Sequence, residues 1–216
     1  MGSKTVSLVM GTYNPNKEWL NDALESSDRL FDETIIVDDG SNVPLDNYVV
    51  EARRIYHARN AGFYEARNTG CRNVQSEWIA ALDDDDEFIR ENVKELKEFL
   101  KTTDADIVHF PVELFGEQTG YWGHNANMDN ILLNNQIPSG SWFKKEVWEK
   151  VKFKLPTAED WDFWARAKKH GFKFAYFQKP VYRHRMRSDS LSGQWVGDKF
   201  LEIREQVRQN YDKEII

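Results

Sequence analysis

Acidic side chains occur in three short groups that could bind a cation, accept a ligand's hydrogen bond or accept a proton. The densest group is Asp83–Asp86, which Glu87 follows directly. Adjacent carboxylates repel one another, and a divalent cation with a preference for oxygen, Mg²⁺ or Mn²⁺, relieves that repulsion. An EF-hand loop counted from Asp83 fails, because Phe88 and Lys94 stand where glycine and glutamate are needed. A solvated acidic helix start remains the alternative.

The other two groups are Asp38-Asp39-Gly40-Ser41 and Glu159-Asp160-Trp161. The first follows an apolar run, so a carboxylate there could accept a hydrogen bond from a base N–H or a ribose hydroxyl. A plain Asp-Gly turn is the alternative. The second group opens a predicted helix, where an acid serves either as a general base or as a cap.

Cationic and aromatic side chains offer weaker signals. His184 could ligate a metal or be structural. Three arginines around it could face a diphosphate or form a solvated basic edge: Arg183, Arg185 and Arg187. Trp122, Trp142 and Trp161 could stack on a sugar ring, although aromatic side chains more often belong to the core.

The first half of the chain alternates apolar runs with helical patterns, which predicts a mostly parallel sheet covered on both faces. The predicted strands are Val6–Met10, Thr34–Val37, Arg54–His57, Trp78–Leu82 and Asp106–Val112, and the predicted helices are Lys17–Ser27, Phe63–Val74 and Ile89–Leu100. Three polar groups follow strands directly: Thr12-Tyr13-Asn14, Asp38–Ser41 and Asp83–Asp86. Ligands of such sheets bind at the carboxyl ends of the strands, so we expect these groups to form one site.

The second half is less regular. We predict a hairpin and loop at Glu113–Asn135, helices at Lys144–Val151 and Ala158–His170, and strands at Lys173–Phe177 and Val181–His184. From Trp195 onward, one helical face is apolar at Val196, Phe200, Ile203, Val207 and Tyr211. Packing of this face on its own domain is favoured, and a homodimer or a membrane surface are the alternatives.

Composition narrows the class of protein. The chain has 216 residues, 40% of them hydrophobic, and a net charge of −7, which disfavours nucleic acid as a partner. Its one cysteine, Cys71, excludes an internal disulfide and a cysteine-rich zinc site. No apolar run reaches the ~20 residues that span a bilayer, and the start lacks a signal peptide pattern. We therefore expect a soluble, cytoplasmic protein, with association at a membrane surface left open.

Taken in order, the motifs resemble the family 2 glycosyltransferases of the GT-A fold. They are Thr12-Tyr13-Asn14, Val37–Ser41, Asn60-Ala61-Gly62 with Ala66–Gly70, Leu82–Asp86 and Glu159-Asp160-Trp161, and they cover roughly residues 4–190. The resemblance implies a Rossmann-like, mostly parallel central sheet flanked by helices, with a smaller antiparallel acceptor-side portion. It also implies one domain over residues 1–216, with a nucleotide-sugar half at 4–112, an acceptor and catalytic half at 113–194 and a C-terminal helix at 195–216.

The resemblance further implies roles for particular residues. Those matching the nucleotide site are Thr12, Tyr13, Asn14, Asp39 as the reader of the base, Arg67, Asp83 and Asp84. Asp83 and Asp85 match the ends of the family's Asp-x-Asp motif, so Asp85, with Asp83 and His184, would hold Mn²⁺ or Mg²⁺. Asp160 matches the general base. The residues expected beside sugar or acceptor are Glu159, Gly140, Ser141, Trp142 and Trp161.

The implied reaction moves a hexose from a UDP-sugar to a hydroxyl of a glycan, glycolipid or glycoprotein, with inversion at the anomeric carbon. One departure from the family's pattern is the long acidic run, which leaves the ligating carboxylate undecided. A sugar-phosphate nucleotidyltransferase is the first alternative, but the segment after the first strand, Gly11–Pro15, lacks that class's glycine-rich phosphate loop. A non-catalytic nucleotide-sugar-binding module is the second.

Overall fold

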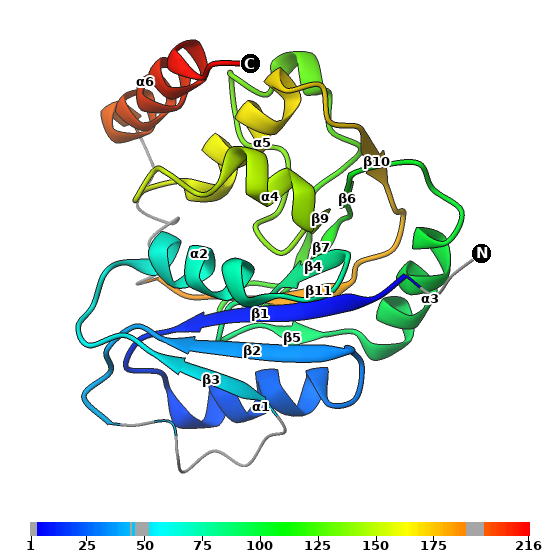
Figure 1. Cartoon of the computed structure of the whole chain (residues 1–216), viewed down its shortest axis with the longest axis vertical. Coiled ribbons are helices and arrows are strands. Elements are labelled where there is room, and N and C mark those ends of the chain that lie inside the picture. The colour runs from blue at the N-terminus through cyan, green and yellow to red at the C-terminus, as the bar shows by residue number, and fades with distance from the viewer. Residues whose placement is uncertain (1–3, 44, 46–51, 189–196) are drawn as a thin grey trace.

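Two β-sheets and six α-helices form the part of the chain that the computed structural model describes, residues 4–43, 45, 52–188 and 197–216 (Figure 1). The larger sheet has the spatial order β10 (Phe174–Tyr176), β6 (Ile107–His109), β9 (Trp142–Lys144), β4 (Trp78–Ala81), β1 (Val6–Thr12), β2 (Glu33–Asp38), β3 (Arg53–Tyr56). The smaller sheet has the order β5 (Glu87–Phe88), β11 (Tyr182–Met186), β7 (Val112–Gly116), β8 (Gly120–Trp122). The helices are α1 (Lys17–Ser27), α2 (Phe63–Asn73), α3 (Arg90–Leu100), α4 (Lys145–Val151), α5 (Glu159–Lys169) and α6 (Gly197–Lys213).

Strand directions confirm the predicted mostly parallel sheet. Every pairing in the larger sheet is parallel except those of β9, which runs antiparallel to both β4 and β6. Neither β9 nor the short β5 was predicted. The smaller sheet is mixed rather than wholly antiparallel, because β11 and β7 are parallel.

One predicted strand, Asp106–Val112, is divided between the two sheets. β6 ends at His109 and β7 begins at Val112. Pro111 lies between them, and proline has no N–H with which to continue a ladder. The chain therefore leaves the larger sheet there and enters the smaller one.

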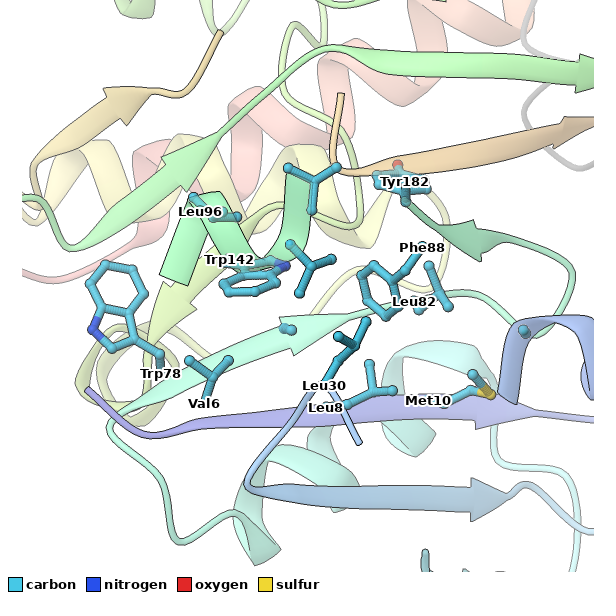
Figure 2. Packing of buried hydrophobic residues seen from close by; sticks show 14 of the residues in the cluster. Val6, Leu8, Met10, Leu30, Trp78, Leu82, Phe88, Leu96, Trp142 and Tyr182 are labelled. Atoms are coloured by element: carbon cyan, nitrogen blue, oxygen red, sulfur yellow. The ribbon is translucent and has the colours of Figure 1, made fainter. Parts of the chain in front are cut away.

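Alternate residues of β1 serve two separate cores, as the two-residue period of a strand requires. Val6, Leu8 and Met10 pack in the same cluster as residues of α1 and α3, and Figure 2 shows them along β1, with Val6 beside Trp78 and Met10 at the other end. Val9 points to the opposite face, where α2, α4 and α5 supply the apolar partners. Burial on both faces explains why the strands read as continuous apolar runs in the sequence.

α6 lies against α5, so the favoured packing prediction for its apolar face is confirmed. Ile203 and Val207 are buried, and the Phe200 ring stacks on Trp161 with centroids 5.8 Å apart. Asn210 Nδ2 also donates a hydrogen bond to Asp162 Oδ1 at 3.1 Å. The predicted start of this helix, 195–196, lies outside the described residues. No described helix is both long enough and apolar enough to cross a membrane.

Candidate functional site

The polar groups after β1, β2 and β4 lie at the same edge of the larger sheet. Register pairs Thr12 with Asp38, and the Asp39 N–H donates to the Thr12 carbonyl at 2.8 Å. The Leu82 N–H in turn donates to the Val9 carbonyl at 3.3 Å, which brings the following acidic run to this edge. Parallel strands thus place three segments together that lie far apart in the sequence.

Two loops at this edge are tied to each other by Asn14. Its backbone N–H donates to Ser41 Oγ and its side-chain oxygen accepts from the Asn42 N–H, both at 2.8 Å. Asn14 has a φ of 47°, in the left-handed region that asparagine tolerates better than most residues. Tyr13, between Asn14 and the end of β1, is 48% exposed, so part of its side chain is accessible to a ligand.

Asp39 is buried, and its carboxylate organises the turn at Asn60–Gly62. Oδ1 accepts from the Ala61 N–H at 3.0 Å and Oδ2 from the Gly62 N–H at 2.8 Å. Gly40 allows the close approach, because a Cβ there would lie 2.6 Å from the Arg59 carbonyl carbon and its φ is +80°. The Asp-Gly turn and the inward carboxylate, which appeared as alternatives in the sequence, occur together.

Each carboxylate of the acidic run meets a different partner. Asp83 contacts Arg67, Asp84 accepts from the Thr12 hydroxyl, Asp85 lies 3.5 Å from Arg187 Nε, and Asp86 contacts His184. Burial, with repulsion from the neighbouring aspartates, raises the pKa of Asp84 to about 6 and raises that of Asp85. The run is therefore folded into the site rather than being a solvated helix start.

His184 is held by the innermost of these carboxylates. Its Nδ1 donates to Asp86 at 3.0 and 3.1 Å, and Asp86 also accepts from the Arg185 N–H at 2.9 Å. Burial alone would lower the pKa of His184, but the hydrogen bond and charge of Asp86 raise it to about 9. A carboxylate on one ring nitrogen is the arrangement that orients the other nitrogen of metal-binding histidines.

Arg67 joins the acidic run to the start of α5. Its buried guanidinium donates to Asp83 Oδ1 at 2.8 Å and to Glu159 Oε1 at 3.4 Å. Burial, with repulsion from Asp160, raises the pKa of Glu159 to about 8. Burial also raises the pKa of Asp160, which accepts hydrogen bonds from Asn135 Nδ2 at 2.9 Å and from the Trp161 N–H at 2.7 Å. These contacts bring the predicted base and the predicted Asp-x-Asp motif into one cluster.

Several residues that were expected beside the sugar or acceptor are buried in the protein interior. Trp142 and Trp161 are fully buried in the two cores, so neither can stack on a sugar in this structure, and their role is packing. Ser141 is likewise buried. Gly140 permits a close approach, because a Cβ there would lie 2.7 Å from the Tyr182 ring.

Two of the three predicted diphosphate arginines already pair with Glu87, the residue that follows the acidic run. Arg183 contacts Glu87 and Glu113 and lies over the Phe115 ring. Arg185 donates to the Asp85 carbonyl at 2.9 Å and also contacts Glu87. Arg187 is the one that contacts a carboxylate of the run, Asp85.

Sequence reasoning missed His57 and Asn135. His57 follows β3 at the same sheet edge, and its Nδ1 donates to Asp39 Oδ1 at 2.6 Å. Its place as the last residue of the predicted strand Arg54–His57 was the signal that could have found it. Asn135 lies in the irregular segment before β9, where no periodic pattern relates it to Asp160.

Comparison of the sequence with known protein families agrees with the arrangement of these side chains. The sequence profile described as "Glycosyl transferase family 2" matches residues 7–184, most of the chain. The chain belongs to this family. A similar protein is an uncharacterized glycosyltransferase of Methanocaldococcus jannaschii, 23% identical over 86% of this chain and 72% of that protein. Another is the glycosyltransferase GlyA of Streptococcus pneumoniae, 25% identical over 76% of this chain but only 28% of that protein.

Solved structures confirm the GT-A fold of this family 2 glycosyltransferase. S. aureus TarS 1-349 in complex with UDP superposes with a TM-score of 0.73 at 17% identity, over 98% of this chain and 67% of that chain. Its complex with UDP-GlcNAc gives 0.74 at 16% identity, over 98% of this chain and 68% of that chain. At such identity the likeness establishes the fold.

Proposed function

We propose that this family 2 glycosyltransferase moves a hexose from a UDP-sugar to an acceptor hydroxyl, with inversion at the anomeric carbon. The observation that carries the proposal is the bridge through Arg67 between Asp83 and the Glu159–Asp160 pair. In this proposal, the bridge brings the general base close to the carboxylates that the family resemblance assigns to the nucleotide site. The UDP and UDP-GlcNAc complexes of TarS favour uridine as the nucleoside.

Asp160 is the proposed general base. The acceptor oxygen forms a bond to the anomeric carbon while its proton passes to the Asp160 carboxylate. The bond from that carbon to the diphosphate oxygen breaks, and the nucleoside diphosphate leaves with the electron pair. Attack from the face opposite the leaving group inverts the configuration. Asn135 and the Trp161 N–H each donate a hydrogen bond to one oxygen of the Asp160 carboxylate. These bonds fix the orientation of the carboxylate toward an approaching acceptor hydroxyl.

The residues present fit a divalent cation that is shared with the substrate. Among the described residues no three acidic, histidine or cysteine side chains gather into a protein-only metal cage. Mg²⁺, however, is commonly held by one or two carboxylates together with substrate phosphates. Asp85 would be the carboxylate ligand, and the contact of Asp86 with Nδ1 suits His184 to ligate through Nε2. When bound, the cation would neutralise charge on the leaving diphosphate.

The acceptor is a glycan, glycolipid or glycoprotein hydroxyl in this proposal. Tyr121 and Trp122 on β8 are 71% and 42% exposed, and aromatic faces of this kind pack well against sugar rings. Of the three tryptophans predicted to stack on a sugar, Trp122 therefore remains a candidate for contact with the acceptor, and Tyr121 joins it.

A donor panel tests the proposal. Thermal shift with UDP-, GDP- and CMP-sugars, in Mn²⁺ and in EDTA, should give the largest rise in Tm for one UDP-sugar with Mn²⁺. Transfer should then release UDP and give a product of inverted anomeric configuration by proton NMR. Asp85→Asn should lose the Mn²⁺-dependent part of the shift, and Glu87→Gln is a neighbouring control. Retention of configuration, or release of pyrophosphate from UTP and a sugar 1-phosphate, would refute the proposal.

A further inference from the structure

A chain of three side chains connects α2 to the carboxylate expected to read the base. His57 Nδ1 donates to Asp39 Oδ1 at 2.6 Å, and His57 Nε2 lies 2.9 Å from Thr69 Oγ1. A carboxylate can only accept, so Nδ1 carries a proton. The backbone fixes the start of this chain, because the His57 N–H donates to the Asp38 carbonyl at 2.8 Å.

The hydrogen bonds of Asp39 leave it little acceptor capacity. A carboxylate has about four acceptor positions, two on each oxygen. Among the described residues, His57 and Ala61 fill both positions on Oδ1, and Gly62 fills one on Oδ2. One position on Oδ2 is left for a ligand.

A single acceptor position matches one kind of base edge. Uracil presents one N–H, N3–H, between two carbonyl oxygens. Guanine presents two neighbouring donors, N1–H and its amino group, which are best met by both oxygens of a carboxylate. By occupying Oδ1, His57 removes the second acceptor that guanine would use.

We infer that His57 is a positioning residue that makes Asp39 a one-point acceptor and so selects uracil over guanine. This rests on the proposed function, a UDP-sugar donor, together with the role as reader of the base that the family resemblance implies for Asp39. His57 acts through Asp39, since its two ring nitrogens are engaged by Asp39 and Thr69.

Two substitutions separate this role from a structural one. The amide nitrogen of His57→Asn can stand near the place of Nδ1 and keep the bond to Asp39. That of His57→Gln stands nearer Nε2, so it keeps the bond to Thr69 and loses the one to Asp39. Calorimetry with UDP and with GDP in Mn²⁺ compares ligands that differ only in the base.

We expect the ratio of the GDP Kd to the UDP Kd to fall about tenfold or more in His57→Gln, the scale of one hydrogen bond to a charged group. His57→Asn should keep the ratio of the unmodified protein. Equal weakening of UDP and GDP by both variants would indicate a structural role and overturn the inference, as would an unchanged ratio in both. Thr69→Val should change the ratio less than His57→Gln, and a larger change would also count against it. Failure of the unmodified protein to bind UDP would overturn the proposed donor itself, which is a distinguishable result.

Discussion

Replacing Arg67 with methionine removes the cation between the acidic run and the proposed base. Arg67 is 2% exposed and contacts Asp83 at 2.8 Å and Glu159 at 3.4 Å. Removing one partner of a buried ion pair costs about 3–5 kcal/mol of the free energy of unfolding. Because Asp83 is 25% exposed and recovers some water, we expect about 2–4 kcal/mol here. For a chain of this length, that corresponds to a fall in Tm of roughly 5–15 °C.

The loss should grow with pH. Burial raises the pKa of Glu159 and of Asp160, and Arg67 opposes both shifts. Without the arginine, the folded-state pKa values rise further, while the unfolded values stay near about 4. A carboxyl group whose pKa is higher in the folded state contributes less stability as pH rises from the unfolded towards the folded value. The Tm difference should therefore widen as pH rises through the folded-state pKa of Glu159, about 8, and it should be larger near about pH 9 than near about pH 6.

Calorimetric unfolding at both pH values measures this difference. Arg72→Met is a matched control, because Arg72 lies on the same helix and is exposed. A Tm difference that is the same at both pH values would refute the reasoning. So would a loss in Arg67→Met no larger than that in Arg72→Met.

Three further predictions concern single side chains. Asp160→Asn should lower the transfer rate about 10²–10⁴-fold with an unchanged calorimetric Kd for the donor, and normal turnover would exclude Asp160 as the base. Asn135→Ala removes a hydrogen bond that lowers the pKa of Asp160. The acid limb of its rate against pH should therefore move to higher pH, and an unmoved limb would contradict this. Burial raises the pKa of the Cys71 thiol to about 12, so mass spectrometry should detect alkylation only after unfolding, and labelling of the native protein would show the burial to be wrong.

Periodicity predicted the nucleotide half of the fold well. Apolar runs bounded by polar groups located β1, β2 and β4, and α1 was predicted with its observed bounds, Lys17–Ser27. Burial on both faces gives these strands a strong apolar signal, even in β4, which has four residues. The sequence order of their polar ends then predicted which loops meet at the sheet edge.

The short strands and the partners across the site were harder to predict. β9 and β5 contain three and two residues, which is too few for a period to appear. Residue type alone could not decide whether Trp142 contacts a ligand or packs in the core, because both roles use the same aromatic surface. The link between His57 and Asp39 depends on strand order and side-chain direction, neither of which the sequence gives.

α6 ties the proposed chemistry to a part of the chain far from it in sequence. Phe200 stacks on the tryptophan that follows Asp160, and Asn210 holds Asp162 two positions further along. Shortening this protein at residue 197 would remove the packing of α6 from the helix that carries the proposed proton acceptor. A fall in catalytic turnover, more than a loss of solubility, would then reveal the damage. An affinity tag should therefore be attached where it leaves α6 packed against α5.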